Sequence, residues 1–237
     1  MSIAEMATVT ISRQLGSGGN EIAAGVAEAL GLRFIDREMI KRAAHEAGVP
    51  KGALQEMEYE GQRTLVEQVL DILRQMPPIP NPPETALRET ATPLSVHFGG
   101  IFSPTLRPMG TAMDDYVRIV GMVIRDLARE GGVIIVGRGS QVLLKDHPAA
   151  LHVQIIAPFW HRVKTVMESE GLERRAALSR VRTSDRARVD YLRRYHNVNW
   201  LDPQLYDLVI NTVKVPVGVA VELIVEASQT LRANVAH

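Results

Sequence analysis

The stretch ISRQLGSGGNEIA, residues 11–23, follows a short β-branched run and leads into a helical pattern. A strand, a glycine-rich turn and a helix in this order present backbone N–H groups at the positive end of a helix, where phosphate binds. Against the pattern G-x-x-x-x-G-K-[ST], the stretch keeps only its second glycine, Gly18. Arg13 stands at the first glycine position, Gly19 at the lysine and Asn20 at the hydroxyl residue. The stretch therefore resembles a phosphate-binding loop that has lost its lysine.

Two other interpretations of this loop stay open from the residues alone. A tight strand-to-helix turn that binds nothing also needs glycines. Gly16 and Gly18 match the first half of the dinucleotide fingerprint G-x-G-x-x-G, and Asp36 ends the next strand about 20 residues on. The third glycine of that fingerprint falls at Glu21, whose charge should spoil the close packing of helix on strand. The dinucleotide site is therefore the least favoured of the three.

Short apolar strands alternate with helical patterns through much of the chain. Strands are expected at 7–12, 33–36, 132–138, 151–157 and 207–212. Helices are expected at 20–30, 37–47, 54–75, 111–129, 159–168, 172–195 and 217–233. Continuously apolar strands are typical of parallel sheets buried on both faces. We therefore predict an α/β protein with a five-stranded parallel sheet and helices on both faces.

Composition narrows the class of protein. A chain of 237 residues with 46% hydrophobic residues can bury a large core, and its 27 basic residues balance 27 acidic ones. This balance disfavours a nucleic-acid binder. The chain has no cysteine, which excludes disulfides and fits a reducing compartment. No stretch reaches the roughly 20 apolar residues that span a bilayer, so we expect a cytoplasmic protein with no membrane partner.

The chain is expected to fold as a single domain, 1–237, with its core in 7–37 and 111–237. An acceptor-side insert of 38–110 separates the two parts of the core. Residues 76–110 hold eight prolines, which excludes an ordinary helix or a central strand. This segment would cover a bound base, form a contact in a homodimer, or remain an open flap, and the residues do not decide among these roles.

A cluster of arginines occupies residues 173–194, with eight arginines against three acids. Arginines that close over a bound nucleotide bring positive charge and exclude water, as lids do. A solvated helix face with pairs such as Arg186 and Asp190 is the alternative. A nucleic-acid surface is a third interpretation, weakened because no aromatic residue is interleaved before Tyr191. We interpret residues 170–200 as a lid.

Four segments together resemble one known family. In chain order they are TVTISRQLGSGGNEIAAGVAEALGLRFIDREMI, VIIVGRGSQVLL, LHVQIIAPFWHRV and DPQLYDLVINT. They are similar to the cytidylate kinase-like family of P-loop proteins, and more distantly to bacterial cytidylate kinases, over residues 8–48 and 112–228. The resemblance implies a three-layer P-loop NTPase fold with a helical acceptor-binding lobe and a lid. It also implies ATP as phosphoryl donor, Mg²⁺ with the nucleotide, and cytidine monophosphate (CMP) as the favoured acceptor.

The resemblance assigns site residues position by position. The donor phosphates would be lined by Gly16, Ser17, Gly18 and Gly19, followed in the helix by Asn20 and Glu21. Asp36 and Arg37 would mark the mouth of the acceptor site, and Arg138 would bind the acceptor phosphate. From its own position in the arginine-rich segment, Asp185 would orient a lid arginine or help to hold the acceptor hydroxyl, the alternative being a solvated side chain. The lid would contribute Arg182, Arg186 and Arg188, which act with Arg138 on the transferred group.

The missing lysine matters because phosphoryl transfer depends on positioning and on positive charge around the transferred group. Members of the family also tend to read Ser-Arg at this point, and arginine binds phosphate bidentately. We hypothesise that the guanidinium of Arg13 replaces the ammonium, the alternative being an arginine paired with a surface acid. For Mg²⁺, neither Asn20 nor Glu21 is the usual hydroxyl ligand, and Glu21 would either hold the ion or stabilise the helix end. The seven histidines show no metal-ligand spacing, so no metal site of side chains is predicted.

These observations predict an enzyme that transfers the γ-phosphoryl group of ATP to a nucleoside monophosphate. Two alternatives stay open. Gly19 fits a nucleotide-binding regulatory protein, a degenerate kinase without turnover. Gly139 follows Arg138 where cytidylate kinases carry an aspartate, which fits a kinase for another small acceptor.

Overall fold

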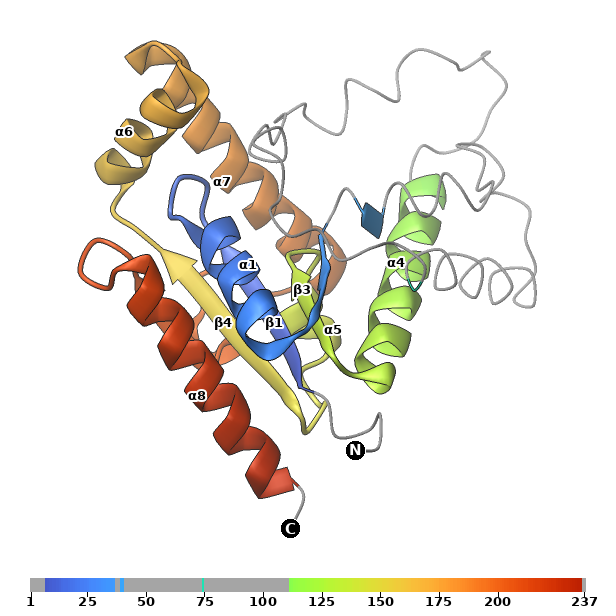
Figure 1. Ribbon diagram of the computed structural model, residues 1–237. Helices are drawn as coiled ribbons and strands as arrows, with labels where there is room; N and C mark the ends of the chain where they lie inside the picture. The colour runs from blue at the N-terminus through green and yellow to red at the C-terminus, as the bar shows by residue number, and fades with distance from the viewer. Residues whose placement is uncertain (1–6, 37–38, 41–73, 75–110, 236–237) are drawn as a thin grey trace.

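Five parallel strands form the centre of the molecule. The computed structural model describes residues 7–36, 39–40, 74 and 111–235. The strands are β1 (Thr8–Arg13), β2 (Arg33–Ile35), β3 (Val133–Val136), β4 (Ala150–Ile156) and β5 (Leu208–Asn211). They lie in the order β2-β3-β1-β4-β5, and all their pairings are parallel. The carboxyl ends of the strands therefore lie at one edge of the sheet (Figure 1).

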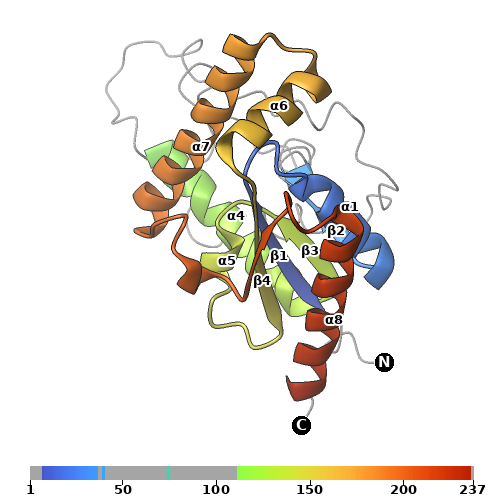
Figure 2. The same cartoon turned by 90° about the vertical axis from the view of Figure 1, so that its left-hand side faces the viewer.

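Helices lie on both faces of the sheet and complete three layers, as predicted (Figure 2). They are α1 (Gly19–Leu30), α4 (Thr111–Glu130), α5 (Ser140–Leu143), α6 (Phe159–Glu170), α7 (Arg174–His196), α8 (Val217–Val235) and the 3-10 helix η4 (Pro203–Leu205). The short helix α5 was not expected from the sequence. The helices expected at 37–47 and 54–75 and the proline-rich segment 76–110 lie outside the described residues, except for 39–40 and 74. No helix in the described ranges is long and apolar enough to cross a membrane.

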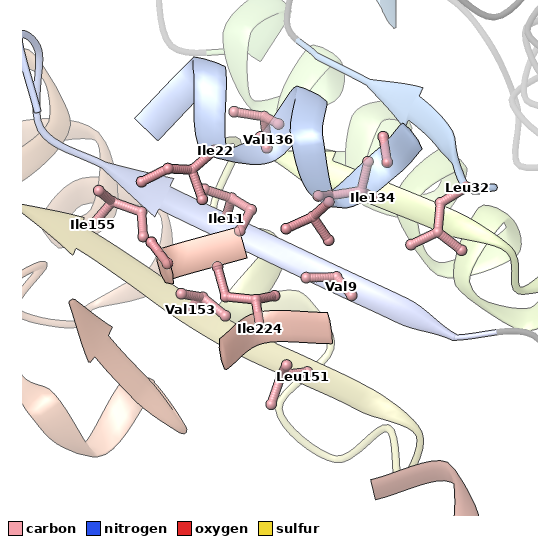
Figure 3. Close-up of a cluster of buried hydrophobic side chains, with 14 of the residues drawn as sticks. Val9, Ile11, Ile22, Leu32, Ile134, Val136, Leu151, Val153, Ile155 and Ile224 are labelled. Carbon is pink, nitrogen blue, oxygen red and sulfur yellow. The ribbon is translucent and has the colours of Figure 1, made fainter. Parts of the chain in front are cut away.

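One face of the sheet packs against α1 and α8. Side chains alternate along a strand, so Val9 and Ile11 of β1 point to this same face, and both are fully buried. Ile22 of α1 and Ile224 of α8 pack around them (Figure 3). The buried positions of α1 recur at helical spacing and are Gly19, Ile22, Ala23, Val26 and Ala27. This packing holds the first turn of α1 against the carboxyl end of β1.

The opposite face of the sheet is covered by α4. Ile119, Val123 and Leu127 lie four residues apart on this helix and are buried. They belong to one apolar cluster with Val133 and Ile135 of β3. The strand that leads to Arg138 is therefore held from both sides.

A buried polar layer lies beside α4 on that same face. Thr10 and Ser12 of β1 are buried, and Thr10 Oγ1 lies 2.8 Å from Nδ1 of His152 on β4. Ser12 Oγ accepts a hydrogen bond from Trp200 Nε1 at 2.8 Å. The hydroxyl of Tyr206 donates to the Trp200 carbonyl at 2.8 Å. Because these polar groups are paired, the layer is stable, and it ties the segment after α7 to the strand just before the glycine loop.

The imidazole of His152 should make stability depend on pH. Burial lowers the pKa of His152, and the Asp207 carboxylate opposes this only in part. As the pH falls, the histidine of the unfolded chain, whose pKa is near its ordinary value of 6.5, therefore takes up a proton before the histidine of the folded protein does. The free energy of unfolding should be highest above that pH and should fall as the pH decreases below it.

Urea denaturation at a series of pH values tests this expectation. The variant His152→Gln should lose part of the decrease at low pH, because its side chain does not titrate. The matched control, His161→Gln, changes an exposed histidine on α6 and should keep the full pH dependence. Equal slopes for the two variants would contradict the role of His152.

Candidate phosphate-binding site

The glycine loop joins the carboxyl end of β1 to the start of α1. Gly16 and Gly18 have φ angles of 78° and 75°, in the left-handed region that favours glycine. A Cβ atom on Gly16 would lie 2.6 Å from the carbonyl oxygen of Arg162. The loop therefore packs backbone against backbone on α6, and any side chain at position 16 would separate the two.

The N-terminus of α1 is built to receive an anion. Gly18 is the N-cap residue, and because it is a glycine it has no side chain that could cap the helix. The first intrahelical bond in this turn runs from the N–H of Ile22 to the Gly18 carbonyl at 3.1 Å. The N–H groups of Gly19, Asn20 and Glu21 precede it and have no carbonyl partner within the helix. These groups and the helix dipole together favour phosphate at this end.

Ser17 supports the loop with its side chain and does not point it at the anion position. Its hydroxyl is buried and donates to the Gln14 carbonyl at 2.7 Å and the Ile155 carbonyl at 3.3 Å. The Ser17 carbonyl in turn accepts from Thr212 Oγ1 at 2.9 Å. Ser17 thus connects the loop to the strand ends of β4 and β5.

The side chain of Arg13 fills the space beside Gly19. A Cβ atom on Gly19 would lie 2.4 Å from Arg13 Cβ, 2.8 Å from Arg13 Cγ and 3.3 Å from Ile155 Cβ. No side chain fits at position 19 while Arg13 lies there. The lysine of the motif is therefore absent for a steric reason. The Cβ and Cγ atoms of Arg13 occupy the space that a side chain at position 19 would need.

The guanidinium of Arg13 is held at the carboxyl edge of the sheet. Its Nε donates to Oδ1 of Asn20 at 2.8 Å, in the first turn of α1. A Cβ atom on Gly137 would lie 3.1 Å from Arg13 Nη1, which places the other end of the group beside the turn after β3. Asn20, at the hydroxyl position of the motif, thus orients the arginine. A positive charge lies between the helix end and the β3 turn.

The turn after β3 has an unusual backbone. Gly137, Arg138 and Gly139 have successive φ angles of 79°, 62° and 68°. Arg138 is one of two residues other than glycine with a positive φ in the described ranges, the other being Asn197. A left-handed arginine is costly and is commonest at functional sites. Arg138, a predicted site residue, thus follows directly on Gly137, whose Cβ position lies 3.1 Å from Arg13 Nη1.

His196, at the end of α7, lies against this turn, and the sequence analysis did not identify it. A Cβ atom on Gly139 would lie 2.7 Å from His196 Nε2. The imidazole thus fills the space that a side chain at position 139 would need. Burial, and then the nearby charge of Arg125, lower the pKa of His196. No local pattern predicts this contact, because the two residues are far apart in the chain.

The acceptor residues after β2 are only partly described. Asp36 Oδ1 accepts a hydrogen bond from the N–H of Met39 at 2.9 Å, so the carboxylate caps the turn that follows β2. Arg37 lies outside the described residues. The placement of the acceptor by Asp36 and Arg37 stays a prediction.

Helices α6 and α7 form a hairpin that is tied to the loop by Arg162. The guanidinium of Arg162 donates to both carboxylate oxygens of Asp185, at 3.0 Å and 2.7 Å. It also donates to the Ala157 carbonyl at 3.0 Å and the Leu15 carbonyl at 3.3 Å. Asp185, predicted as an acceptor residue, is therefore engaged in a bidentate ion pair that joins the two helices.

Sequence reasoning missed Arg162, although a signal was present. The buried positions of α6 are Arg162, Val163 and Val166, so an arginine lies on the apolar face of an amphipathic helix. A charged residue on such a face needs a partner. The pattern indicated a buried ion pair, but only the folded chain shows that its partner is Asp185.

The three predicted lid arginines have different surroundings on α7. Arg186 is 85% exposed in its side chain and pairs with Asp190 at 3.8 Å, as in the solvated alternative. Arg182 is exposed, with its Cζ 5.7 Å from the centre of the Phe159 ring. Arg188 faces the body of the protein, with its Cζ 5.7 Å from the centre of the Trp200 ring. Arg188 thus lies against Trp200, whose Nε1 donates to Ser12 of β1.

A five-stranded parallel sheet, a glycine-rich turn after β1 and a helical hairpin after β4 define a P-loop nucleoside triphosphatase fold. The chain belongs to the cytidylate kinase-like family, whose model matches residues 8–214. Membership supports a nucleotide kinase in general and leaves the acceptor undefined.

Solved structures share this fold. An uncharacterized protein from Eubacterium ventriosum is similar with a TM-score of 0.59 at 19% identity, over 94% of this chain and 99% of that chain. A shikimate kinase from Acinetobacter baumannii, in complex with shikimate, has a TM-score of 0.42 at 13% identity, over 98% of this chain and 96% of that chain. The first of these similarities shows the fold alone.

A curated protein matches part of the sequence. It is a uronate isomerase from Corynebacterium glutamicum, 35% identical over 103 residues. The match covers 44% of this chain and 20% of the isomerase. The chain thus corresponds to one fifth of that protein, and the match carries no conclusion about activity.

Proposed function

We propose that the protein is a nucleotide kinase that transfers the γ-phosphoryl group of ATP to a nucleoside monophosphate, with CMP as the first candidate. The observation that carries this proposal is the reciprocal placement of Arg13 and Gly19. The arginine stem occupies the position of the missing lysine, and its guanidinium lies between the α1 N-terminus and the β3 turn. A loop that had lost its function would have no reason to keep a cation there.

The residues of the loop fit the donor nucleotide. Backbone N–H groups of the first turn of α1 would bind its phosphates, and Arg13 would stabilise the charge that develops on the transferred group. Bound Mg²⁺ would neutralise phosphate charge in the same place. Because Asn20 Oδ1 already accepts a hydrogen bond from Arg13, Glu21 is the side chain that this turn offers to the ion.

The acceptor side rests on Arg138 and Asp36. Arg138 lies on the strained turn whose Gly137 lies against the Arg13 guanidinium, and its own guanidinium would hold the phosphate of the acceptor. We assign Asp185 to the structure of the lid, because Arg162 binds both of its oxygens. Cytidylate kinases carry an aspartate at the position of Gly139. In this protein the imidazole of His196 fills the space beside that glycine. This replacement favours a different acceptor as the second candidate.

A coupled ADP-release assay with MgATP tests the proposal, with CMP, dCMP, UMP, AMP and GMP as acceptors and chromatographic identification of the product. Formation of CDP would support the first candidate. Turnover of another monophosphate would support the second. ATP binding in calorimetry without any product would favour the regulatory protein. A chain without cysteine fits the reducing cytoplasm, where these substrates occur.

A further inference from the structure

Trp160, in the first turn of α6, is a large aromatic side chain left in solvent. It is 57% exposed, more than any other exposed large hydrophobic residue in the described ranges, whereas Trp200 is 2% exposed. Indole rings are seldom left in water without a ligand or a partner, because their burial is strongly favourable.

The first turn of α6 borders the phosphate loop. The backbone of Arg162 lies against Gly16, with 2.6 Å between the Arg162 carbonyl oxygen and the position of a Gly16 Cβ. Leu15 of the loop packs in one cluster with Phe159, the neighbour of Trp160. In both views of the molecule the start of α6 lies next to the loop that precedes α1 (Figure 1, Figure 2). Trp160 therefore lies at the rim of the phosphate-binding site.

The surroundings of the indole suit a flat aromatic ligand. The Phe159 and Trp160 rings are 5.2 Å apart at 74°, in an edge-to-face contact that holds the indole from one side. The guanidinium carbon of Arg174 lies 5.4 Å from the centre of the Trp160 ring. More than half of the side-chain surface remains open. The result is an exposed aromatic surface with a guanidinium beside it.

We propose that the base of the donor nucleotide stacks on Trp160. This inference rests on the proposed function, because the phosphates must occupy the glycine loop for the base to reach its rim. Stacking needs only the π face of a base, and nucleobases stack on exposed aromatic side chains of this kind in other proteins. The contact therefore adds affinity for a purine donor with little selection between adenine and guanine.

Tryptophan fluorescence reads this contact directly, because the chain has only Trp160 and Trp200. The wild-type protein and the variant Trp160→Phe are each titrated with MgATP, with excitation at a wavelength that ATP does not absorb. In the variant, Trp200 is the tryptophan that emits. ATP should change the emission of the wild type and leave that of the variant nearly constant. Inorganic tripolyphosphate, which has phosphates and no base, should displace ATP and cause no such change.

Calorimetry measures the affinity that stacking supplies. Trp160→Leu should weaken MgATP binding on the order of tenfold and change tripolyphosphate binding less than about twofold. Trp160→Phe should keep most of the affinity, because it keeps an aromatic ring. The control, Leu223→Ala, removes another exposed apolar side chain on α8 and should leave both affinities unchanged.

The outcomes separate this inference from the proposed function. If the wild type binds ATP and Trp160→Leu binds it equally well, the stacking inference is wrong and the kinase proposal stands. That result would assign Trp160 to a protein contact instead. If neither ATP nor tripolyphosphate binds the wild type, the kinase proposal fails and the stacking inference fails with it.

Discussion

Arg13→Ala is expected to lower kcat for phosphoryl transfer by about a thousandfold, the effect of removing a charge that stabilises the transferred group. The side chain is the cation that the loop presents in place of lysine, held by Asn20 at 2.8 Å. The measurement is the steady-state rate with saturating MgATP and the acceptor found in the panel. The control, Arg129→Ala, removes an arginine whose side chain is 70% exposed at the end of α4, and should keep wild-type rates.

Restoring the consensus lysine by itself should not help. In Gly19→Lys the new Cβ atom would lie 2.4 Å from Arg13 Cβ, so the loop must shift and activity should fall. Arg13→Gly opens that space, and the double variant Arg13→Gly/Gly19→Lys recreates the full glycine and lysine spacing. The double variant should be faster than either single variant. A fully active Gly19→Lys protein, or an unchanged rate in Arg13→Ala, would show that Arg13 does not replace the lysine.

Arg162→Met should lower the free energy of unfolding by about 3 kcal/mol. The arginine side chain is 4% exposed and binds both oxygens of Asp185, whose side chain is 26% exposed. Removing the arginine leaves a partly buried carboxylate without its partner and frees the carbonyls of Ala157 and Leu15. Urea denaturation measures the change. The expected loss is large because the pair joins the phosphate loop, β4 and both lid helices.

A double-mutant cycle separates the ion pair from the packing. Asp185→Leu combined with Arg162→Met should cost less than the sum of the single variants, because no lone charge remains. The exposed pair Lys164 and Glu168, at 3.7 Å in α6, is the control, and Lys164→Met should change stability by less than about 0.5 kcal/mol. If Arg162→Met costs no more than Lys164→Met, the ion pair does not hold the lid in place.

Much of the fold was predictable because it depends on local patterns. The apolar runs of the strands and the helical spacing of Ile22 and Val26 predicted the parallel sheet and the first helix. The turn glycines were also recognisable, since Gly16 and Gly18 both have the left-handed backbone that the loop requires. These features follow from side-chain alternation, helical periodicity and backbone sterics within a few residues.

The site was predictable only in part. The sequence places Arg13, Gly18 and Gly19 around one turn, but only the structure shows that the Arg13 side chain fills the space beside Gly19. Asp185 was expected to orient a lid arginine or to help hold the acceptor, with a solvated side chain as the alternative, and its partner Arg162 was not identified. Arg186 was expected in the closed lid and lies on the outer face of α7.

The amino-acid order alone thus settles the class of fold, the place of the phosphate loop and the absence of its lysine, since each depends on neighbours along the chain. Folding alone settles which distant groups meet: Arg13 with Gly137, Arg162 with Asp185, and His196 with Gly139. The first contact arises because parallel strands bring the ends of segments more than a hundred residues apart to one edge of the sheet, and the last arises because α7 then crosses that edge. Arg162 and Asp185 meet because α6 and α7 pack against each other as a hairpin. No periodic pattern in the sequence predicts these contacts.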